Sequence, residues 1–248
     1  MQAALKNKTA IVTGASRGIG RAIALKLGQS GASVVVNYAR NAKAAGEVVS
    51  QIIESGGQAV SVRADMQKIS QINALFDAAE QHFGSIDILV NNAGIALFKK
   101  IADITEKEFD DSFALNVKGL FFACQQAAKR MADGGKIINI SSSVTKMMLP
   151  DYGVYAATKG AVEQITKVLA KELGHRKIAV NAISPGPVDT ELFRQGKTEQ
   201  QIQNLADMAA FGRIGTPGDI AGAVVLLVSG EAGWISGQNL CVNGGFAA

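Results

Sequence analysis

The segment TGASRGIG, residues 13–20, joins a short β-branched apolar run at 9–13 to a segment at 18–30 whose apolar residues recur at helical spacing. Gly14 can make the sharp exit from a strand, Gly18 lets backbone approach a phosphate, and Gly20 lets the helix pack closely on the sheet. The helix N-terminus adds free N–H groups and partial positive charge for a pyrophosphate. Glycines alone are weak evidence, but their place between a strand and a helix predicts a dinucleotide-binding turn.

The rest of the chain continues this alternation of strands and helices. Further strands are predicted at 33–37, 59–63, 86–90, 136–140, 178–183 and 239–242, and further helices at 44–55, 71–83, 105–131, 155–173 and 219–228. The alternation predicts an α/β fold: one Rossmann-type domain over residues 1–248, with a doubly wound parallel sheet of about seven strands and helices on both faces. The least regular stretch, about 187–215, suits a lid over a pocket.

Composition excludes several other classes of protein. The 248 residues are 48% hydrophobic, and the net charge of +4 comes from Lys and Arg scattered among Asp and Glu, so we expect no nucleic-acid partner. No apolar run approaches the roughly 18 residues of a membrane span, so we expect no membrane partner. Cys124 and Cys241 form no CxxC pair, which favours a reducing, cytoplasmic setting. His82 and His175 have no ligand-like neighbours, so we expect no metal.

The end of the second strand indicates which nicotinamide cofactor the turn binds. NAD-binding folds usually place an acid there to hold the ribose hydroxyls. Here the sequence is Val36-Asn37-Tyr38-Ala39-Arg40, without an acid, and Arg17 lies in the turn itself. Either arginine alone could equally be a solvated surface charge. Two guanidinium groups near a ribose suit a 2′-phosphate, so together they predict NADP(H).

Four motifs in this order resemble the short-chain dehydrogenase/reductase family over essentially the whole chain. They are TGASRGIG at 13–20, NNAG at 91–94, Tyr155-x-x-x-Lys159, and Pro185-Gly186 after the sixth strand. The resemblance implies Asn116, Ser142, Tyr155 and Lys159 as catalytic residues. It also implies a cofactor site made of Gly14, Ser16, Arg17, Gly18, Ile19, Gly20, Asn37, Tyr38, Ala39, Arg40, Ala64, Asp65, Met66, Asn92, Ala93, Gly94, Tyr155, Lys159, Pro185, Gly186, Val188 and Thr190.

The chemistry of Tyr155 and Lys159 can be argued from their spacing. Reduction of a carbonyl needs an acid that protonates the oxygen, and a free tyrosine, with a pKa near 10, is a poor match to neutral pH. Residues at i and i+4 share one helix face, so the Lys159 ammonium, together with oxidised nicotinamide, is expected to lower the pKa of Tyr155. Ser142, 13 residues before Tyr155, can stabilise charge on the substrate oxygen.

Rival residues lie beside these candidates. Such a Tyr–Lys pair alone would usually belong to an ordinary amphipathic helix. Tyr152 has Ala156 rather than a lysine at i+4. Ser141 and Ser143 point to the opposite side of an extended chain from Ser142, and are weaker candidates for that reason.

The predicted substrate is a small carbonyl or alcohol compound. Its pocket is predicted to contain Ser142, Met147, Met148, Tyr152, Phe193 and Phe211, and these largely apolar residues suit a hydrophobic ketone. Two alternatives stay open: a 3-oxoacyl-[acyl-carrier-protein] reductase, for which Arg176 is a possible carrier contact, and a catalytically silent NADP-binding regulator. The family resemblance further implies a homotetramer.

Overall fold

A seven-stranded sheet runs through the computed structural model, which describes residues 4–247. All neighbouring strands are parallel, in the order β3-β2-β1-β4-β5-β6-β7. The strands are β1 (Thr9–Val12), β2 (Ser33–Tyr38), β3 (Gln58–Arg63), β4 (Ile88–Asn91), β5 (Lys136–Ile140), β6 (Ala179–Pro185) and β7 (Asn239–Val242). The predicted doubly wound α/β fold of Rossmann type is therefore confirmed.

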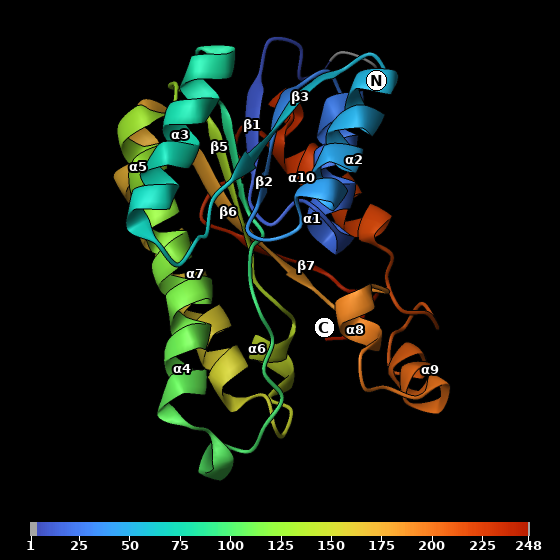
Figure 1. Cartoon of the computed structure of the whole chain (residues 1–248). Coiled ribbons are helices and arrows are strands. Elements are labelled where there is room, and N and C mark those ends of the chain that lie inside the picture. Colours follow the sequence, from blue (N-terminus) through green and yellow to red (C-terminus); the bar gives the residue numbers. More distant parts are fainter. Residues whose placement is uncertain (1–3, 248) are drawn as a thin grey trace.

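Helices cover both faces of the sheet (Figure 1). The α-helices are α1 (Gly18–Gln29), α2 (Ala42–Glu54), α3 (Ile69–Phe83), α4 (Glu106–Phe113), α5 (Leu120–Arg130), α6 (Val144–Met147), α7 (Gly153–Glu172), α8 (Glu191–Arg194), α9 (Glu199–Asp207) and α10 (Pro217–Val228). Helices α1, α2 and α10 pack on one face, and α3, α5 and α7 on the other. None of the helices within residues 4–247 has the length and apolar character needed to cross a membrane.

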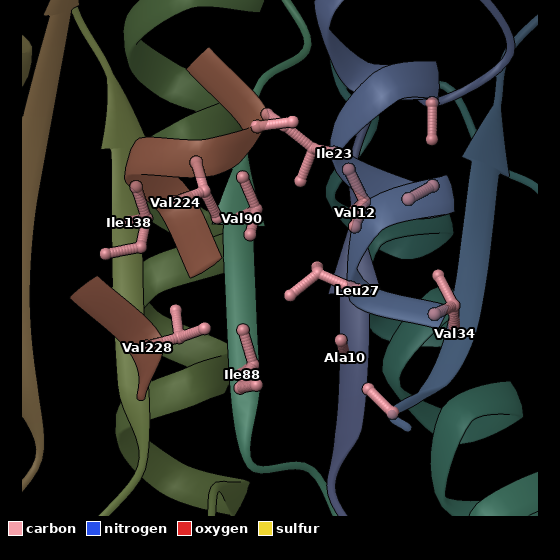
Figure 2. Packing of buried hydrophobic residues seen from close by; sticks show 14 of the residues in the cluster. Ala10, Val12, Ile23, Leu27, Val34, Ile88, Val90, Ile138, Val224 and Val228 are labelled. Atoms are coloured by element: carbon pink, nitrogen blue, oxygen red, sulfur yellow. The ribbon is translucent and has the colours of Figure 1, made fainter. Parts of the chain in front are cut away.

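The core follows from the alternation of side chains along each buried strand. Ala10 and Val12 of β1 point toward α1 and α10, together with Ile88 and Val90 of β4 (Figure 2). Ile11, between the first two, points to the opposite core. Both faces of the strands are therefore apolar, which is why the strands read as continuous runs of Val, Ile and Leu.

The predicted helix at 105–131 is present, but it is not a regular α-helix throughout. It begins at a Thr105–Glu108 capping box, as expected, but α4 and α5 are separated by a π-helical turn, Ala114–Gly119. A Cβ on Gly119 would lie 2.3 Å from the Met66 carbonyl oxygen, so the helix meets backbone there at closest approach. A π-turn adds a residue to the helical repeat, and such turns frequently occur at functional sites.

The segment at 187–215 is more regular than the sequence suggested, because it holds α8 and α9. Its two ends are joined by backbone hydrogen bonds from Gly215 N to Pro187 O (2.8 Å) and from Asp189 N to Gly215 O (2.8 Å). In Figure 1 both helices lie beyond the ends of the strands, on the side of the molecule where α6 also lies. We call this segment the lid.

The sheet order reverses between β1 and β4. In open α/β sheets a crevice forms at this switch point, outside the carboxyl ends of the strands. The residues that follow β1, β4, β5 and β6 therefore meet at one edge of the sheet.

Candidate functional site

The glycine turn after β1 has the backbone shape that its sequence suggested. Gly14 and Gly18 have φ of 62° and 55°, a region that favours glycine. A Cβ on Gly20 would lie 2.4 Å from both Asn92 Nδ2 and Gly14 O, so no side chain fits there. No acidic residue occupies the first turn of α1, and no side chain caps its N-terminus. The turn therefore leaves backbone N–H groups free to receive a phosphate.

The NNAG segment after β4 braces this turn. Thr13 Oγ1 accepts hydrogen bonds from the backbone N–H groups of Asn92 and Ala93, both at 3.0 Å. Asn92 Nδ2 donates to the carbonyl oxygens of Thr13 (2.9 Å) and Gly14 (3.1 Å). The side chain of Asn92 therefore stabilises the conformation of the glycine turn.

The side-chain amide of Asn37, a residue predicted to bind the cofactor, is fully engaged in hydrogen bonds within the protein. Its Oδ1 accepts from Gly14 N (3.1 Å), and its Nδ2 donates to the carbonyl oxygens of Ala64 (3.0 Å) and Val62 (3.3 Å). The side chain is 1% exposed. Asn37 thus ties the ends of β2 and β3 to the glycine turn, next to the partly buried Asp65.

Arginines gather around the end of β2. Arg17 and Arg40 are exposed, and Arg17 Nη1 lies 3.9 Å from Glu191 Oε2, a weak ion pair in water. Arg63 was missed in the sequence: it pairs with Tyr38 across the strands and donates from Nε to Ala39 O (3.3 Å). Its signal was its place at the end of the third strand, level with the residue before Ala39.

The loop after β6 closes the other side of the turn. A Cβ on Gly186 would lie 2.9 Å from Asn243 Cβ, so the chain passes close to the segment after β7. Val188 is 5% exposed, and Thr190 caps α8 by accepting from Phe193 N (3.1 Å). A Cβ on Gly18 would contact the Thr190 methyl at 3.5 Å, so the loop faces the glycine turn.

Tyr155 and Lys159 lie together on α7, opposite the end of β5. Lys159 Nζ is 5.6 Å from the centre of the Tyr155 ring and donates to Ile140 O (2.7 Å). Lys159 is 5% exposed, and burial lowers its pKa to about 8. Burial raises the pKa of Tyr155 to about 12, opposed by a hydrogen bond with Ser142.

In the protein alone, Lys159 does not lower the pKa of Tyr155; that the ammonium and oxidised nicotinamide together lower it stays a prediction. Desolvation outweighs the other influences, and the Lys159 ammonium is directed to the backbone of β5 rather than to the phenol. At neutral pH the tyrosine is protonated, which is the form that donates a proton.

Ser142 differs from its two neighbours in how its hydroxyl is used. Ser141 Oγ donates to Glu163 Oε1 (3.0 Å), and Ser143 Oγ donates to Ser184 O (3.3 Å); both serines are 2% exposed. Ser142 is partly exposed, and its Oγ accepts only a 3.3 Å bond from Val144 N among the hydrogen bonds of residues 4–247, apart from its contact with Tyr155.

Asn116 lies in the π-helical turn, 2% exposed. It binds both backbone groups of Ile95, accepting from N (2.9 Å) and donating to O (2.8 Å). It also donates to Thr158 Oγ1 (3.1 Å), which in turn donates to Tyr155 O (2.7 Å). The amide therefore links the loop after β4 to the helix that carries Tyr155.

The predicted substrate pocket separates into two groups. Tyr152 and Phe193 lie near Phe98, whose ring centre is 4.7 Å from that of Tyr152 and 6.5 Å from that of Tyr155. Met147 instead packs with the C-terminal Phe246.

The other two predicted pocket residues are largely exposed. Met148 and Phe211 each have 75% of their surface accessible. Phe211 lies against Gly244, and its backbone N donates to Gly244 O (3.1 Å). Phe98 was not identified in the sequence, although a lone aromatic residue four positions after NNAG was a usable signal.

Among residues 4–247 no cluster of three or more potential metal ligands occurs.

Fold and site together define a Rossmann-type oxidoreductase. Residues 14–247 match the family model described as enoyl-(acyl carrier protein) reductase. An uncharacterized oxidoreductase of Methylorubrum extorquens is 45% identical over 243 residues, 97% of this chain and 98% of the relative. The chain belongs to the short-chain dehydrogenase/reductase family.

Solved structures of the same family superimpose closely. A short-chain dehydrogenase/reductase from Serratia marcescens has a TM-score of 0.95 and 39% identity, covering 98% of this chain and 99% of its own. The angucycline C-6 ketoreductase LanV with bound NADP has a TM-score of 0.94 and 41% identity, covering 99% and 97%. LanV is also known with NADP and rabelomycin, at a TM-score of 0.91.

Proposed function

We propose that the protein is an NADP(H)-dependent reductase that converts a ketone or aldehyde to an alcohol, or catalyses the reverse reaction. The observation that carries this proposal is the meeting of Ser142, Tyr155 and Lys159 beside the glycine turn, with Asn116 joined to Tyr155 through Thr158. These groups come from separate elements, and a purely structural role would not require them to converge.

The residues present fit a dinucleotide. The turn has no room for a side chain at Gly20, and Gly14 and Gly18 have positive φ. The N-terminus of the helix that follows has no side-chain cap and no acidic residue in its first turn. When bound, the cofactor would supply or accept the hydride at the carbonyl carbon. The residues that would hold it are the glycine turn, the Asp65 and Asn92–Gly94 segments, and the loop from Pro185 to Thr190.

Each catalytic side chain has a distinct task in this proposal. Tyr155, protonated at neutral pH, donates its proton to the carbonyl oxygen in the reductive direction. The Ser142 hydroxyl stabilises the developing charge on the same oxygen. Lys159 holds the nicotinamide ribose and favours the phenolate once the proton has left. Asn116 fixes the loop after β4 and the start of α7 relative to each other.

A preference for NADP(H) is supported by charge. Arg17, Arg40 and Arg63 surround the end of β2, where no acid is available for ribose hydroxyls. Guanidinium groups suit a 2′-phosphate. The LanV ketoreductase, similar over nearly the whole chain, binds NADP, which supports the same choice.

Free ketones are favoured over carrier-bound thioesters. Arg176, the possible carrier contact, directs its guanidinium inward to Asp133 Oδ1 (2.8 Å), Ala128 O (2.6 Å) and Met131 O. Its side chain is 23% exposed. LanV with rabelomycin supports a small-molecule ketone as substrate. We also propose a homotetramer, for which exposed apolar patches on two different parts of the molecule are the support.

Steady-state turnover of NADPH and NADH with free ketones and with acetoacetyl thioesters tests the proposal, with Tyr155→Phe as control. Fast NADPH oxidation with free ketones, reduced at least ~100-fold in Y155F, is expected. A clear preference for NADH would overturn the cofactor assignment. Turnover of thioesters alone would favour the carrier-protein reductase, and NADPH binding without any turnover would favour the silent regulator.

A further inference from the structure

A lysine of the lid sits between two aromatic rings. Lys197 Nζ lies 4.8 Å from the centre of the Phe193 ring and 5.0 Å from the centre of the Phe98 ring. One of its three N–H groups donates to Phe193 O (2.9 Å). Phe193 and Lys197 belong to the lid and Phe98 to the loop after β4, so the ammonium bridges the lid and the body of the protein.

This ammonium is connected to Tyr155 through the ring of Phe98. Phe98 packs against Tyr152 at 4.7 Å and lies 6.5 Å from Tyr155, between ring centres. One aromatic ring therefore separates Lys197 from the tyrosine that donates the proton. A substrate held with its carbonyl at Tyr155 and its body along Phe98 would extend toward the ammonium.

The charge on Lys197 has no acidic partner within residues 4–247. The neighbouring lid cation, Arg194, has two: Asp189 at 2.6 Å and Glu199 at 3.1 Å. Partial burial lowers the pKa of Lys197, a cost of desolvation that no carboxylate of the described chain offsets. Aromatic faces attract the ammonium but do not neutralise it, and they leave its remaining N–H groups without an oxygen acceptor.

We propose that Lys197 is a specificity-determining residue that binds an anionic oxygen of the substrate, so that the preferred substrates are ketones with an apolar or aromatic body and a carboxylate or similar anion. This inference rests on the carbonyl-reductase function proposed above. A hydrogen bond from the ammonium to such an oxygen joins two opposite charges, which neither the two rings nor the Phe193 carbonyl provide. The aromatic residues Phe98, Tyr152 and Phe193 then flank the apolar body of the same substrate.

A matched pair of substrates isolates the charge. 4-Acetylbenzoate and methyl 4-acetylbenzoate share the ketone and the ring, and differ in the carboxylate at the far end of the ring from the ketone. With NADPH, Lys197→Met is expected to raise the KM for 4-acetylbenzoate about tenfold while the KM for the ester changes less than about twofold. Lys197→Arg, which keeps the charge, is expected to retain most of the preference for the acid. Lys171→Met, an exposed lysine near the far end of α7, controls for the overall charge of the protein.

The opposing results are equally specific. If K197M impairs both substrates alike, Lys197 is a lid-to-body contact and the inference fails; if it impairs neither, the inference also fails. Calorimetric binding of 4-acetylbenzoate and its methyl ester in the presence of NADP⁺ compares wild type and K197M without turnover. Loss of acid binding alone in K197M supports the inference even in a protein that reduces neither compound, a result that would overturn only the proposed function.

Discussion

At the scale of single residues, Glu163 holds the chain on both sides of Ser142. Its Oε1 accepts from Ser141 Oγ (3.0 Å) and from Thr145 Oγ1 (2.7 Å), and Glu163 lies one turn after Lys159 on α7. A loop fixed at both sides keeps its middle residue in place. We expect Glu163→Leu to lower kcat by about tenfold to a hundredfold through misplacement of Ser142, with the KM for NADPH unchanged.

Glu163→Gln separates the hydrogen bonds from the charge, because it keeps an acceptor oxygen. It is expected to restore most of the activity lost in E163L, whereas Glu172→Leu, exposed on the same helix, should have no effect. An E163Q enzyme as slow as E163L would instead mean that the negative charge matters, and the positioning role would be wrong. Steady-state kinetics of the four proteins decides between these accounts.

Lys159 should leave a signature in the dependence of stability on pH. Its pKa is about 8 in the folded protein, below the ordinary 10.5, so between these values the unfolded chain binds a proton that the folded chain does not. Stability from this group therefore rises with pH across that window, and its cost is fully present below pH 8. From pH 7.5 to 9.5 we expect wild type to gain up to about 2 kcal/mol relative to Lys159→Met.

Urea denaturation of both proteins at several pH values measures this difference. Comparison with the variant removes the opposing contribution of Cys124, whose pKa is raised to about 12 by burial and which acts in both proteins. A pH-independent difference between wild type and K159M would show that Lys159 is not desolvated as described.

At the scale of elements, Gly119 marks the point where the helix after the π-turn meets the loop after β3. A Cβ there would lie 2.3 Å from Met66 O, and a shift of the backbone to relieve this overlap would cost free energy. Gly119→Ala should therefore destabilise the protein by about 2–4 kcal/mol despite the better helix propensity of alanine. Gly46→Ala on α2, where nothing lies within 4 Å, should stabilise it by about 0.8 kcal/mol. Thermal or urea unfolding measures both, and a G119A protein as stable as G46A would contradict the close approach.

One feature of this element could not be predicted from the sequence. Helix, strand and turn boundaries were predicted to within a few residues because buried strands are uniformly apolar and glycines occupy the turns. The π-turn has no local pattern, since ALNVKG at 114–119 is compatible with a regular helix. At its end Gly119 packs against the Met66 backbone, which lies far away in sequence. By contrast, the start of α9 could have been predicted from its capping box, Thr198–Gln201. The interpretation of the lid as irregular overlooked this pattern.

The site shows the same division. The proximity of motif residues at strand ends could be predicted from the sequence, because the carboxyl ends of parallel strands lie at one edge of the sheet. Phe98 and Lys197 could not, because their meeting depends on how the lid folds over the body rather than on any spacing in the chain. The raised pKa of Tyr155 could likewise not be predicted from the sequence, since it depends on burial and on the direction in which Lys159 points.

At the scale of the whole molecule, two separate apolar patches argue for an assembly with two kinds of interface. One is a hollow of about 400 Å³ on α4, the π-turn and α5, lined by Phe113, Val117 and Phe121 among others. The other contains the neighbouring residues Trp234, which is fully exposed, and Ile235. Patches of exposed aromatic and aliphatic residues on a folded chain usually mark interaction surfaces.

Two perpendicular, intersecting twofold axes, one through each patch, would generate a closed tetramer in which each interface pairs a surface with its own copy. We therefore expect Phe121→Arg and Trp234→Arg each to convert a tetramer to a dimer in sedimentation velocity, and the double variant to be a monomer. An arginine on each side of a twofold axis places like charges against each other within an apolar surface, so each substitution acts twice per interface. Lys171→Met is the control for a surface change outside both patches. A wild-type protein that sediments as a monomer would refute the tetramer. A tetramer that survives both substitutions would mean that other surfaces hold it together.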